Sequence, residues 1–459
     1  IIVITLAEGS MEMAYEIKEI SIDEIRRQEA ICAEIFDKTA GRAGRQPLAM
    51  VDTYGCQQNE ADSEKIRGYL AEMGYGFTQN EFEADVIVVN TCAVREHAEM
   101  RVLGNVGQLN HSKKQRPGQI IAVCGCMVQQ EHMAEKIKKS YPVVDLVFGP
   151  HELWRFPELL QKTMTGKKRV FAVDRSDGFV AEGMPLKRDG KVRAWLSVMY
   201  GCNNFCTYCV VPYVRGRERS RRPEDIVAEA QQLVAGGYKD ITLLGQNVNS
   251  YGRDLGGETD FADLIRMIND IPGEFLIRFM TSHPKDATEK LFRTMAECDK
   301  CAHQLHLPVQ SGNDRVLKAM NRRDTKASLT EMLAKLRAKI PGLVLRTSLI
   351  TGLPYEDEAA LEELCDFLRE TRIERAGVFP FSPEEGTKAA QMEHVDTEEA
   401  QRRAELVVDV QSDIIDAYNE SVLGSEREVL CEGFDGQAQM FFGRSYAESP
   451  DIDGRIYFT

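Results

Sequence analysis

The chain has 459 residues, of which 43% are hydrophobic and 28% are charged, a balance that is ordinary for a water-soluble protein with two or three domains. It contains no run of about 18 apolar residues, and its short apolar opening lacks the basic leading region of a secretory signal. We therefore expect a cytoplasmic protein that does not enter a membrane. The net charge of −15 does not favour nucleic-acid binding over the whole surface, but local patches decide that question.

The first third of the chain predicts a parallel α/β domain. Residues 1–46 read as an N-terminal extension, mostly helical, that ends in a glycine-rich junction at 41–45. From 47 to 165, continuous apolar runs typical of buried strands alternate with helical patterns, which favours a parallel sheet covered by helices. The expected strands are 48–53, 84–90, 119–123 and 143–148.

The rest of the chain predicts a linker, a second α/β domain and a short β segment. Residues 166–190 are polar and rich in glycine, as expected of a linker. Six strand–helix units within 191–423 suggest a (β/α)6 partial barrel rather than a full eight-unit barrel. Its expected strands are 194–200, 240–244, 276–281, 304–307, 344–350 and 375–379. Residues 424–459 look like short strands and turns of an incomplete β-domain.

The strongest chemical signal is the loop that carries Cys202, Cys206 and Cys209, directly after the first expected barrel strand. Without a secretory signal, disulfides are not expected, and clustered cysteines point to metal ligation or catalysis. The C-x3-C-x2-C spacing suits three irons of a 4Fe–4S cube, whose fourth iron is open to bind S-adenosylmethionine (SAM) and pass it an electron. The competing interpretation is a zinc site or three unrelated core cysteines, but zinc prefers four ligands.

A second set of cysteines is spread over the first domain. Cys56, Cys92 and Cys126 are about 35 residues apart, and each follows an expected strand. Because ligands bind outside the carboxyl ends of parallel strands, we expect these thiols to converge and to hold a second cluster. A buried, inert cysteine is the competing interpretation for each one alone. Cys124 alternates with Cys126, so we expect it to point away and to be structural.

Polar residues at the ends of the expected barrel strands are candidates for the SAM and substrate pocket. For each of them a purely structural hydrogen bond is an equal alternative. We expect Gln246 and Ser282 to bind the cofactor. The whole set is Gln246, Asn247, Ser282, His283, His306, Gln310 and Ser311.

The densest basic patch is the segment 215–222, which contains five arginines. A solvated loop is the simplest interpretation of such a run. Its position directly after Cys209 also suits contacts with phosphates at the rim of the barrel.

Four motifs together resemble the methylthiotransferase family of radical SAM enzymes: 54–59 (YGCQQN), 90–95 (NTCAVR), 124–127 (CGCM) and 201–209 (GCNNFCTYC). The resemblance covers the chain from about residue 48. It implies that Cys202, Cys206 and Cys209 hold the SAM cluster. It also implies that Cys56, Cys92 and Cys126 hold an auxiliary 4Fe–4S cluster that supplies or carries sulfur, and that Tyr208 lies beside the SAM adenine. An external electron donor such as flavodoxin or ferredoxin is implied as well.

The resemblance divides between two branches of this family. Up to about Arg323 the chain is similar to the branch that methylthiolates isopentenyl-adenosine beside the tRNA anticodon, in 279–284 (FMTSHP) and 306–312 (HLPVQSG). From about Val344 it resembles the branch that methylthiolates an aspartate of a small-subunit ribosomal protein, in 375–379, 382–387 and 443–447. This change suggests a chimera. Tyr355 also stands where the family often has glycine.

Three hypotheses therefore remain open at this point. The front domain, most of the barrel and the arginine run favour methylthiolation of tRNA. The acidic end, with seven Asp and Glu against three Arg in 425–459, favours a basic ribosomal protein as the substrate. The third hypothesis is an iron–sulfur protein without catalytic activity.

Overall fold

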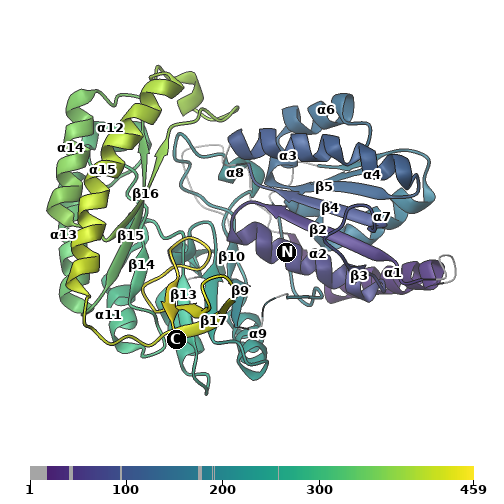
Figure 1. Ribbon diagram of the computed structural model, residues 1–459, viewed down its shortest axis with the longest axis horizontal. Helices are drawn as coiled ribbons and strands as arrows, with labels where there is room; N and C mark the ends of the chain where they lie inside the picture. Colours follow the sequence, from purple (N-terminus) through teal and green to yellow (C-terminus); the bar gives the residue numbers. More distant parts are fainter. Residues whose placement is uncertain are drawn as a thin grey trace. The chain divides into compact units, whose positions relative to one another are not determined.

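Two compact units make up the structure, a computed structural model (Figure 1). The first contains residues up to 189 together with 200–203 and 210–221, and the second contains the remainder. The expected N-terminal extension falls partly outside the described residues, as do Val94 and Arg95 of one cysteine motif. The described residues are 18–40, 45–93, 96–173, 178–188, 190, 192–256 and 258–459.

The first unit is built on a six-stranded parallel sheet in the order β3-β2-β4-β5-β6-β7. Its central strands are runs of apolar and β-branched residues that are buried on both faces, as parallel strands require. The strands are β2 (Leu48–Tyr54), β3 (Gly76–Phe77), β4 (Val86–Thr91), β5 (Ile120–Gly125), β6 (Leu146–Phe148) and β7 (Val170–Ala172).

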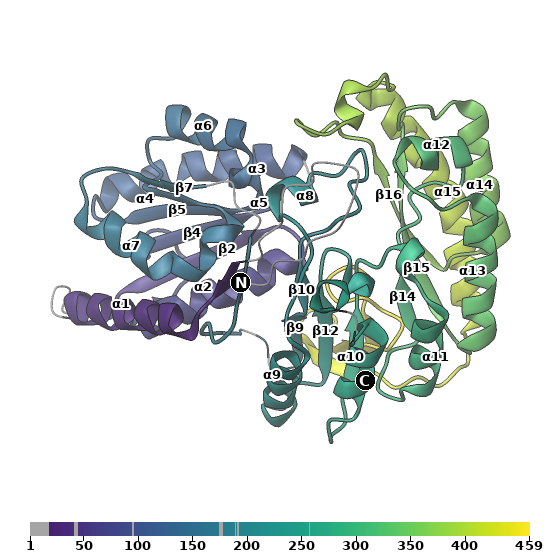
Figure 2. The same cartoon turned by 180° about the vertical axis from the view of Figure 1, so that it is seen from behind.

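Helices cover both faces of this sheet (Figure 2). One face packs against α1 (Ile22–Ala40), α2 (Gln57–Glu72), η1 (Pro150–Arg155) and α7 (Phe156–Thr165). The other face packs against α3 (Glu96–Gln108), α5 (Cys126–Gln129) and α6 (Glu131–Ser140), with α4 (Asn110–Gln115) following α3. The unit is thus a three-layer α/β/α domain, as predicted.

Two segments expected to lie outside this domain belong to it. In α1, within the expected extension, Ile25 and Ile35 are completely buried in the core. Within the expected linker 166–190, β7 extends the main sheet and β8 (Phe179–Ala181) pairs with β1 (Lys18–Ile20). These strands have only three residues each, too few to show a period in the sequence. Residues 174–177 and 189 of the expected linker lie outside the described residues.

The second unit contains the six parallel strands of the expected partial barrel. Backbone hydrogen bonds join the strands in the orders β9-β12-β13 and β14-β15-β16, and a parallel bridge between Ile277 and Cys301 links the two halves. This confirms the (β/α)6 prediction. The strands are β9 (Arg193–Ser197), β12 (Asp240–Leu244), β13 (Leu276–Phe279), β14 (Gln304–His306), β15 (Val344–Thr351) and β16 (Arg375–Pro380).

Helices of this unit lie outside the strands, and Figure 1 shows α13, α14 and α15 along the outer side of β14–β16. The helices are α9 (Pro223–Ala235), α10 (Phe261–Asn269), α11 (Glu289–Glu297), α12 (Asp314–Ala319), α13 (Lys326–Lys339), α14 (Glu358–Thr371) and α15 (Thr397–Ser421). Shorter elements of this unit are η2 (Val248–Ser250), η3 (Arg253–Leu255), η4 (Pro284–Asp286) and η5 (Ala389–Gln391). The segment 210–221 of the first unit contains α8 (Val211–Val214) and β11 (Arg219–Ser220), and β11 pairs with β10 (Met199–Tyr200). None of the described helices is long and apolar enough to cross a membrane.

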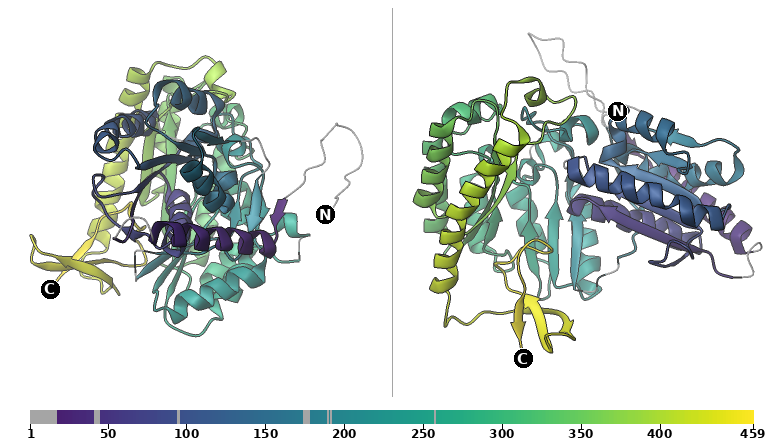
Figure 3. Two further views of the ribbon diagram at one scale, coloured as in Figure 1. Left: turned by 90° about the vertical axis from the view of Figure 1, so that its right-hand side faces the viewer. Right: turned by 45° about the horizontal axis from the view of Figure 1, so that its top comes forward.

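The chain ends in a three-stranded antiparallel sheet of β17 (Leu430–Asp435), β18 (Met440–Arg444) and β19 (Ile456–Phe458) (Figure 3). The segment 444–453 between β18 and β19 makes polar contacts with one residue of each of the six barrel strands, and in four strands this is the first residue. The pairs are Arg193–Asp451, Asp240–Arg444, Arg278 with the carbonyls of Ser445 and Tyr446, Gln304–Ser449, Arg346–Asp453 and Arg375–Glu448. This segment therefore packs on the end at which the strands begin, and we call the other end, at the carboxyl ends of the strands, the barrel mouth.

Tyr355, in the loop between β15 and α14, adopts the left-handed conformation with φ +67°. Its side chain is 62% exposed, so no burial compensates for the backbone strain. A residue with a Cβ pays about 1–2 kcal/mol in this region, whereas glycine adopts it freely. Glycine would therefore suit this backbone conformation better than tyrosine.

We predict that Tyr355→Gly raises the free energy of unfolding by about 0.5–1 kcal/mol, because relief of the strain exceeds the entropy that glycine loses on folding. Urea unfolding under anaerobic conditions measures the change. Tyr355→Ala is the control, because alanine removes the ring and keeps the strain. Equal stabilisation by both substitutions would show that the exposed ring, and not the backbone, is responsible.

Candidate functional site

Three cysteines lie at the same edge of the first unit's sheet. Cys56 follows β2 and precedes α2, Cys92 follows β4, and Cys126 follows β5 as the first residue of α5. Because β2, β4 and β5 are adjacent and parallel, their carboxyl ends meet at this edge. The thiols also interact: a hydrogen bond with Cys92 lowers the pKa of Cys56 to about 6, while burial raises the pKa of Cys126 to about 11.

Two buried asparagines connect the chain segments that carry Cys56 and Cys92. The Asn59 side-chain amide donates to Asn90 Oδ1 (3.1 Å) and to the Thr91 carbonyl (3.2 Å). The Asn90 amide donates in return to the Asn59 carbonyl (2.8 Å). Asn59 Oδ1 also accepts from the Cys56 backbone N–H at 3.3 Å. These amides hold the start of α2 against the end of β4, and they explain the asparagines of the two cysteine motifs.

Gly125 allows the third motif to approach the second. Its φ is +98°, and a Cβ at this position would lie 2.3 Å from the Thr91 carbonyl oxygen. Only glycine fits such an approach. Cys124, on the other side of Gly125, belongs to the core on the α2 face, where burial raises the pKa of its thiol well above the usual range. It is therefore a core residue, as expected.

The thiols of this edge have the donor chemistry of iron–sulfur ligands. The part of the chain that the structure describes contains no group of three or more His, Cys, Asp or Glu arranged to hold one metal ion. In an iron–sulfur cube each thiolate binds a separate iron, so three thiolates at one sheet edge suit a cube with one open iron.

The loop 202–209 carries the second cysteine set. Cys202 is buried in the first unit, and its backbone N–H donates to the Gly216 carbonyl at 3.1 Å. Gly201 before it has φ +77°, and a Cβ there would lie 1.9 Å from the Arg217 carbonyl oxygen. The backbone of this loop is thus held tightly at Cys202.

Cys206 and Cys209 belong to the second unit, where Thr207 and Tyr208 anchor their part of the loop. The Cys209 N–H donates to the Cys206 carbonyl at 2.9 Å. The Thr207 N–H donates to the Met320 carbonyl (3.1 Å), and the Thr207 carbonyl accepts from the Ala389 N–H (2.8 Å). Tyr208 packs on the apolar cluster that contains Met320. Burial, and then the neighbouring Cys206, raises the pKa of the Tyr208 hydroxyl well above its usual range, so Tyr208 is a neutral hydrogen-bonding group.

The polar candidates at the barrel mouth divide into bonded and open groups. Asn247 donates to Asp286 (2.8 Å), and Ser311 Oγ accepts from the Asn313 N–H (3.3 Å), so these side chains have structural partners. Among the described residues, Ser282 Oγ and His306 Nδ1 are buried and have no hydrogen-bond partner. Ser282 follows the carboxyl end of β13, where a ligand can bind, whereas His306 is level with Arg346 of β15, whose side chain pairs with Asp453.

Other candidates at the mouth have less direct evidence. Gln246 is half-buried after β12, and Gln310 has a left-handed backbone with φ +71°. His283 Nδ1 accepts from the Lys285 N–H at 3.2 Å, which gives this ring a structural role. Burial lowers the pKa of His283 to about 2 and that of His306 to about 3. Both imidazoles are therefore neutral at physiological pH.

The arginine run corrects the prediction of a solvated, phosphate-contacting loop. Arg215, Arg219 and Arg221 are buried, and only Arg217 and Arg222 are exposed. Arg221 forms two 2.7 Å bonds to Glu182, and Arg219 donates to the carbonyls of residues 179, 215 and 217. Burial of an arginine requires such partners. Most of this run therefore binds its own unit.

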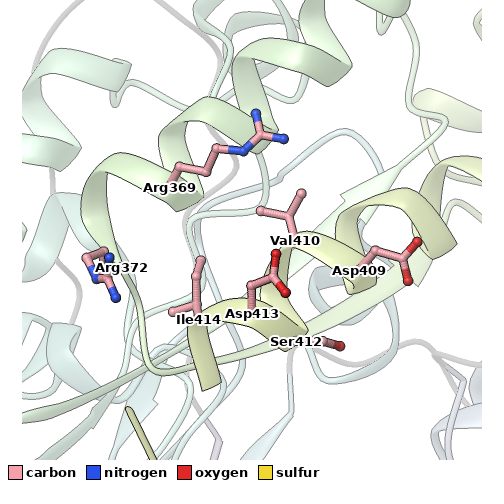
Figure 4. A pocket seen from close by; sticks show the side chains of 7 residues that line it. All are labelled: Arg369, Arg372, Asp409, Val410, Ser412, Asp413 and Ile414. Atoms are coloured by element: carbon pink, nitrogen blue, oxygen red, sulfur yellow. The ribbon is translucent and has the colours of Figure 1, made fainter. Parts of the chain in front are cut away.

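A surface hollow between α14 and α15 offers no comparable chemistry (Figure 4). Arg369 is already bonded to Glu362 (3.1 Å) and Asp366 (2.8 Å). Arg372 ends α14 and precedes the amino end of β16, opposite the barrel mouth. The lining residues are Arg369, Arg372, Asp409, Val410, Ser412, Asp413 and Ile414.

Comparison with known proteins identifies relatives that match most of the chain. A model of the uncharacterized protein family UPF0004 matches residues 49–149, and a model of the Radical SAM superfamily matches residues 196–368. The tRNA-2-methylthio-N(6)-dimethylallyladenosine synthase of Acetivibrio thermocellus is 47% identical over 418 residues, covering 90% of this chain and 87% of that protein. The enzymes of the same name from Thermoanaerobacter sp. and Clostridioides difficile are 45% and 44% identical, again over 90% of this chain and over 88% and 87% of theirs.

These matches give no support to the expected chimera. A match over 90% of 459 residues spans about 413 positions, so it includes residues 47–413 whichever end it omits. Similarity to the tRNA enzymes thus continues through the region around 323–344, where a change to the ribosomal-protein branch was expected.

Solved structures share the fold at low sequence identity. The radical S-adenosylmethionine methyltransferase TsrM from Kitasatospora setae has a TM-score of 0.54 at 12% identity, over 73% of this chain and 72% of that one. The cobalamin-dependent S-adenosylmethionine radical enzyme OxsB has a TM-score of 0.50 at 15% identity, over 81% of this chain and 56% of that one. These likenesses support the α/β architecture alone.

We predict that neutral His306 makes stability sensitive to mild acid. Its pKa rises from about 3 when folded to about 6.5 when unfolded, so the unfolded chain binds the extra proton below pH 6.5. Stability is then complete above pH 6.5 and falls as the pH drops toward 3. His306→Gln should reduce this loss by up to about 1.4 kcal/mol per pH unit.

Urea unfolding between pH 7.5 and 5.5 measures the slope, and the exposed His111→Gln is the control. Identical slopes for His306→Gln and the wild type would contradict the neutral, buried state of His306.

Proposed function

We propose, since this chain belongs to the family of the tRNA-2-methylthio-N(6)-dimethylallyladenosine synthases, that it adds a methylthio group to isopentenyl-adenosine beside the tRNA anticodon. The chain is a radical SAM methylthiotransferase of this family. The observation that supports the tRNA substrate is identity of 44–47% to such enzymes over nine-tenths of the chain. Modification of tRNA would place the protein in the cytoplasm.

The enzyme uses SAM and two 4Fe–4S clusters, as its family does. In our proposal Cys202, Cys206 and Cys209 hold one cluster, and Cys56, Cys92 and Cys126 hold the other. When bound, the first supplies the electron that cleaves SAM, and the second supplies or carries the sulfur. Each set of three cysteines follows parallel strands of its own, which supports this assignment. Cys56, Cys92 and Cys126 follow β2, β4 and β5, and the loop 202–209 follows β9 and β10.

The chain's own groups at the barrel mouth would bind and orient SAM. Ser282 Oγ, after the carboxyl end of β13, is a buried atom whose hydrogen-bonding capacity is unused among the described residues. Tyr208 and Gln246 are proposed to complete the cofactor contacts.

The other partners in this proposal are a tRNA and an external electron donor such as flavodoxin or ferredoxin. The similarity to tRNA enzymes through residue 413 disfavours a ribosomal-protein substrate. That substrate, and the hypothesis of a protein without activity, become outcomes of the mass-spectrometric test.

We predict different effects for the two cysteine triads. Alanine at Cys202, Cys206 and Cys209 should abolish SAM cleavage. Alanine at Cys56, Cys92 and Cys126 should leave SAM cleavage and stop methylthiolation, because only the sulfur supply is lost. Each triple variant should bind about four irons, half the wild-type content of two cubes. Chromatography of SAM products, mass spectrometry of tRNA nucleosides and iron analysis measure the three quantities.

The same mass spectrometry, on cells with and without the gene, separates the substrates. A methylthio group that appears on a ribosomal protein and not on tRNA would move the assignment to the other branch. Methylthiolation by the Cys56, Cys92 and Cys126 variant would refute the role of that triad. A fully loaded wild type that modifies neither substrate would favour a protein without activity.

We predict that Arg217, and not Arg221, contributes to tRNA binding. Arg217 is exposed, whereas Arg221 is buried against Glu182. Arg217→Gln should weaken tRNA binding and lower the slope of log K against log salt by about 0.7–0.9, the value of one phosphate contact. Fluorescence anisotropy across a salt series measures the slope.

Arg221→Gln is the matched comparison, because it removes the same charge and should lower stability while leaving the salt slope unchanged. A reduced slope in the Arg221 variant, or an unchanged one in the Arg217 variant, would contradict this assignment.

A further inference from the structure

Arg215 is a buried cation in direct contact with one of the candidate cluster ligands. Arg215 directly follows α8 and is only 5% exposed. Its Nε donates to the Cys126 sulfur at 2.9 Å, although the two residues are 89 positions apart. Its Nη1 donates to Asp62 Oδ2 at 2.7 Å. One guanidinium therefore connects a cysteine and a carboxylate from distant parts of the first unit.

Asp62 determines how the guanidinium is oriented. Asp62 lies on α2, the helix that begins directly after Cys56, and its other oxygen accepts from the Gln58 side chain at 3.2 Å. A carboxylate fixed in this way holds the planar guanidinium in one orientation. The N–H of Nε is thus directed at Cys126 by a residue of the helix that follows Cys56.

The charges around Arg215 fit an anionic group at this edge better than a simple structural ion pair. Within the pair, Asp62 balances the charge of Arg215. Thiolates at Cys56, Cys92 and Cys126 add further negative charge when they bind metal, because metal binding requires deprotonated ligands. The Nε of Arg215, which is the donor not bonded to Asp62, then faces that negative charge. Because the guanidinium is buried, the attraction is stronger than it would be in water.

We propose that Arg215 is a positioning residue of the auxiliary cluster, whose N–H···S bond to Cys126 orients that ligand and makes the cluster easier to reduce. This inference rests on the proposed function, since it requires the cluster at Cys56, Cys92 and Cys126. Reduction adds negative charge to the cluster and its sulfurs, so a hydrogen-bond donor and a positive charge stabilise the reduced form more than the oxidised form. Asp62 acts through Arg215, by holding it.

The test uses the full chain with alanine at Cys202, Cys206 and Cys209, so that a single cluster reports. Arg215→Gln in this background should lower the equilibrium constant for one-electron reduction at least tenfold, a shift of about 59 mV to more negative potential. Redox titration followed by electron paramagnetic resonance measures it. Iron release to a chelator should also become faster. Arg26→Gln, which removes an exposed arginine on α1 of the same unit, is the control and should change neither quantity.

Asp62→Asn is the second variant, in case Arg215→Gln disturbs folding, which circular dichroism reports. It keeps the guanidinium and weakens its anchor, so a smaller shift in the same direction is expected. A folded variant with four irons and the potential and iron release of the parent would overturn the role of Arg215 alone. Failure of the parent itself to bind four irons would overturn the auxiliary cluster, and with it this inference.

Discussion

The common direction of the strands is the constraint on which both candidate sites depend. Every strand of the first unit's main sheet and of the partial barrel runs parallel to its neighbours. Carboxyl ends therefore gather at one edge of each sheet, and the loops that leave them meet. Cys56, Cys92 and Cys126 lie at one edge in this way in the first unit, and Ser282 lies after the carboxyl end of a barrel strand. The parallel strands determine where the loops meet, and the short motifs in these loops carry the candidate functional residues.

The beginnings of the barrel strands carry buried charged residues, which need partners within the protein. Asp240 is fully buried, and its Oδ2 accepts from Arg278 (3.0 Å) and Arg444 (3.1 Å). A buried charge is tolerated only when it is paired and hydrogen-bonded. The C-terminal segment 444–453 provides such partners to all six strands. The small β segment is therefore part of the barrel's construction.

Much of the fold and of the cysteine site could be predicted from the sequence, because apolar runs and cysteine spacing are local signals. The parallel sheet, the six barrel units and the edge position of the three front cysteines follow from them. The contacts that position these groups are not local: Asn59 meets Asn90 across 31 residues, and Arg215 meets Asp62 across 153. The three-residue strands β7 and β8 were hidden for another reason, since three residues show no period.

The arginine run shows why charge in a sequence does not establish exposure. An arginine can be buried when carbonyls and carboxylates satisfy its donors, and a fold offers many carbonyls at the ends of its elements. Arg219 uses three of them, and Arg221 uses a carboxylate. Arg215 has a carboxylate and a sulfur, and the sulfur belongs to a cysteine of the front triad. The run is therefore best understood as an internal connection between the segment after Cys209 and the cysteine edge of the first unit.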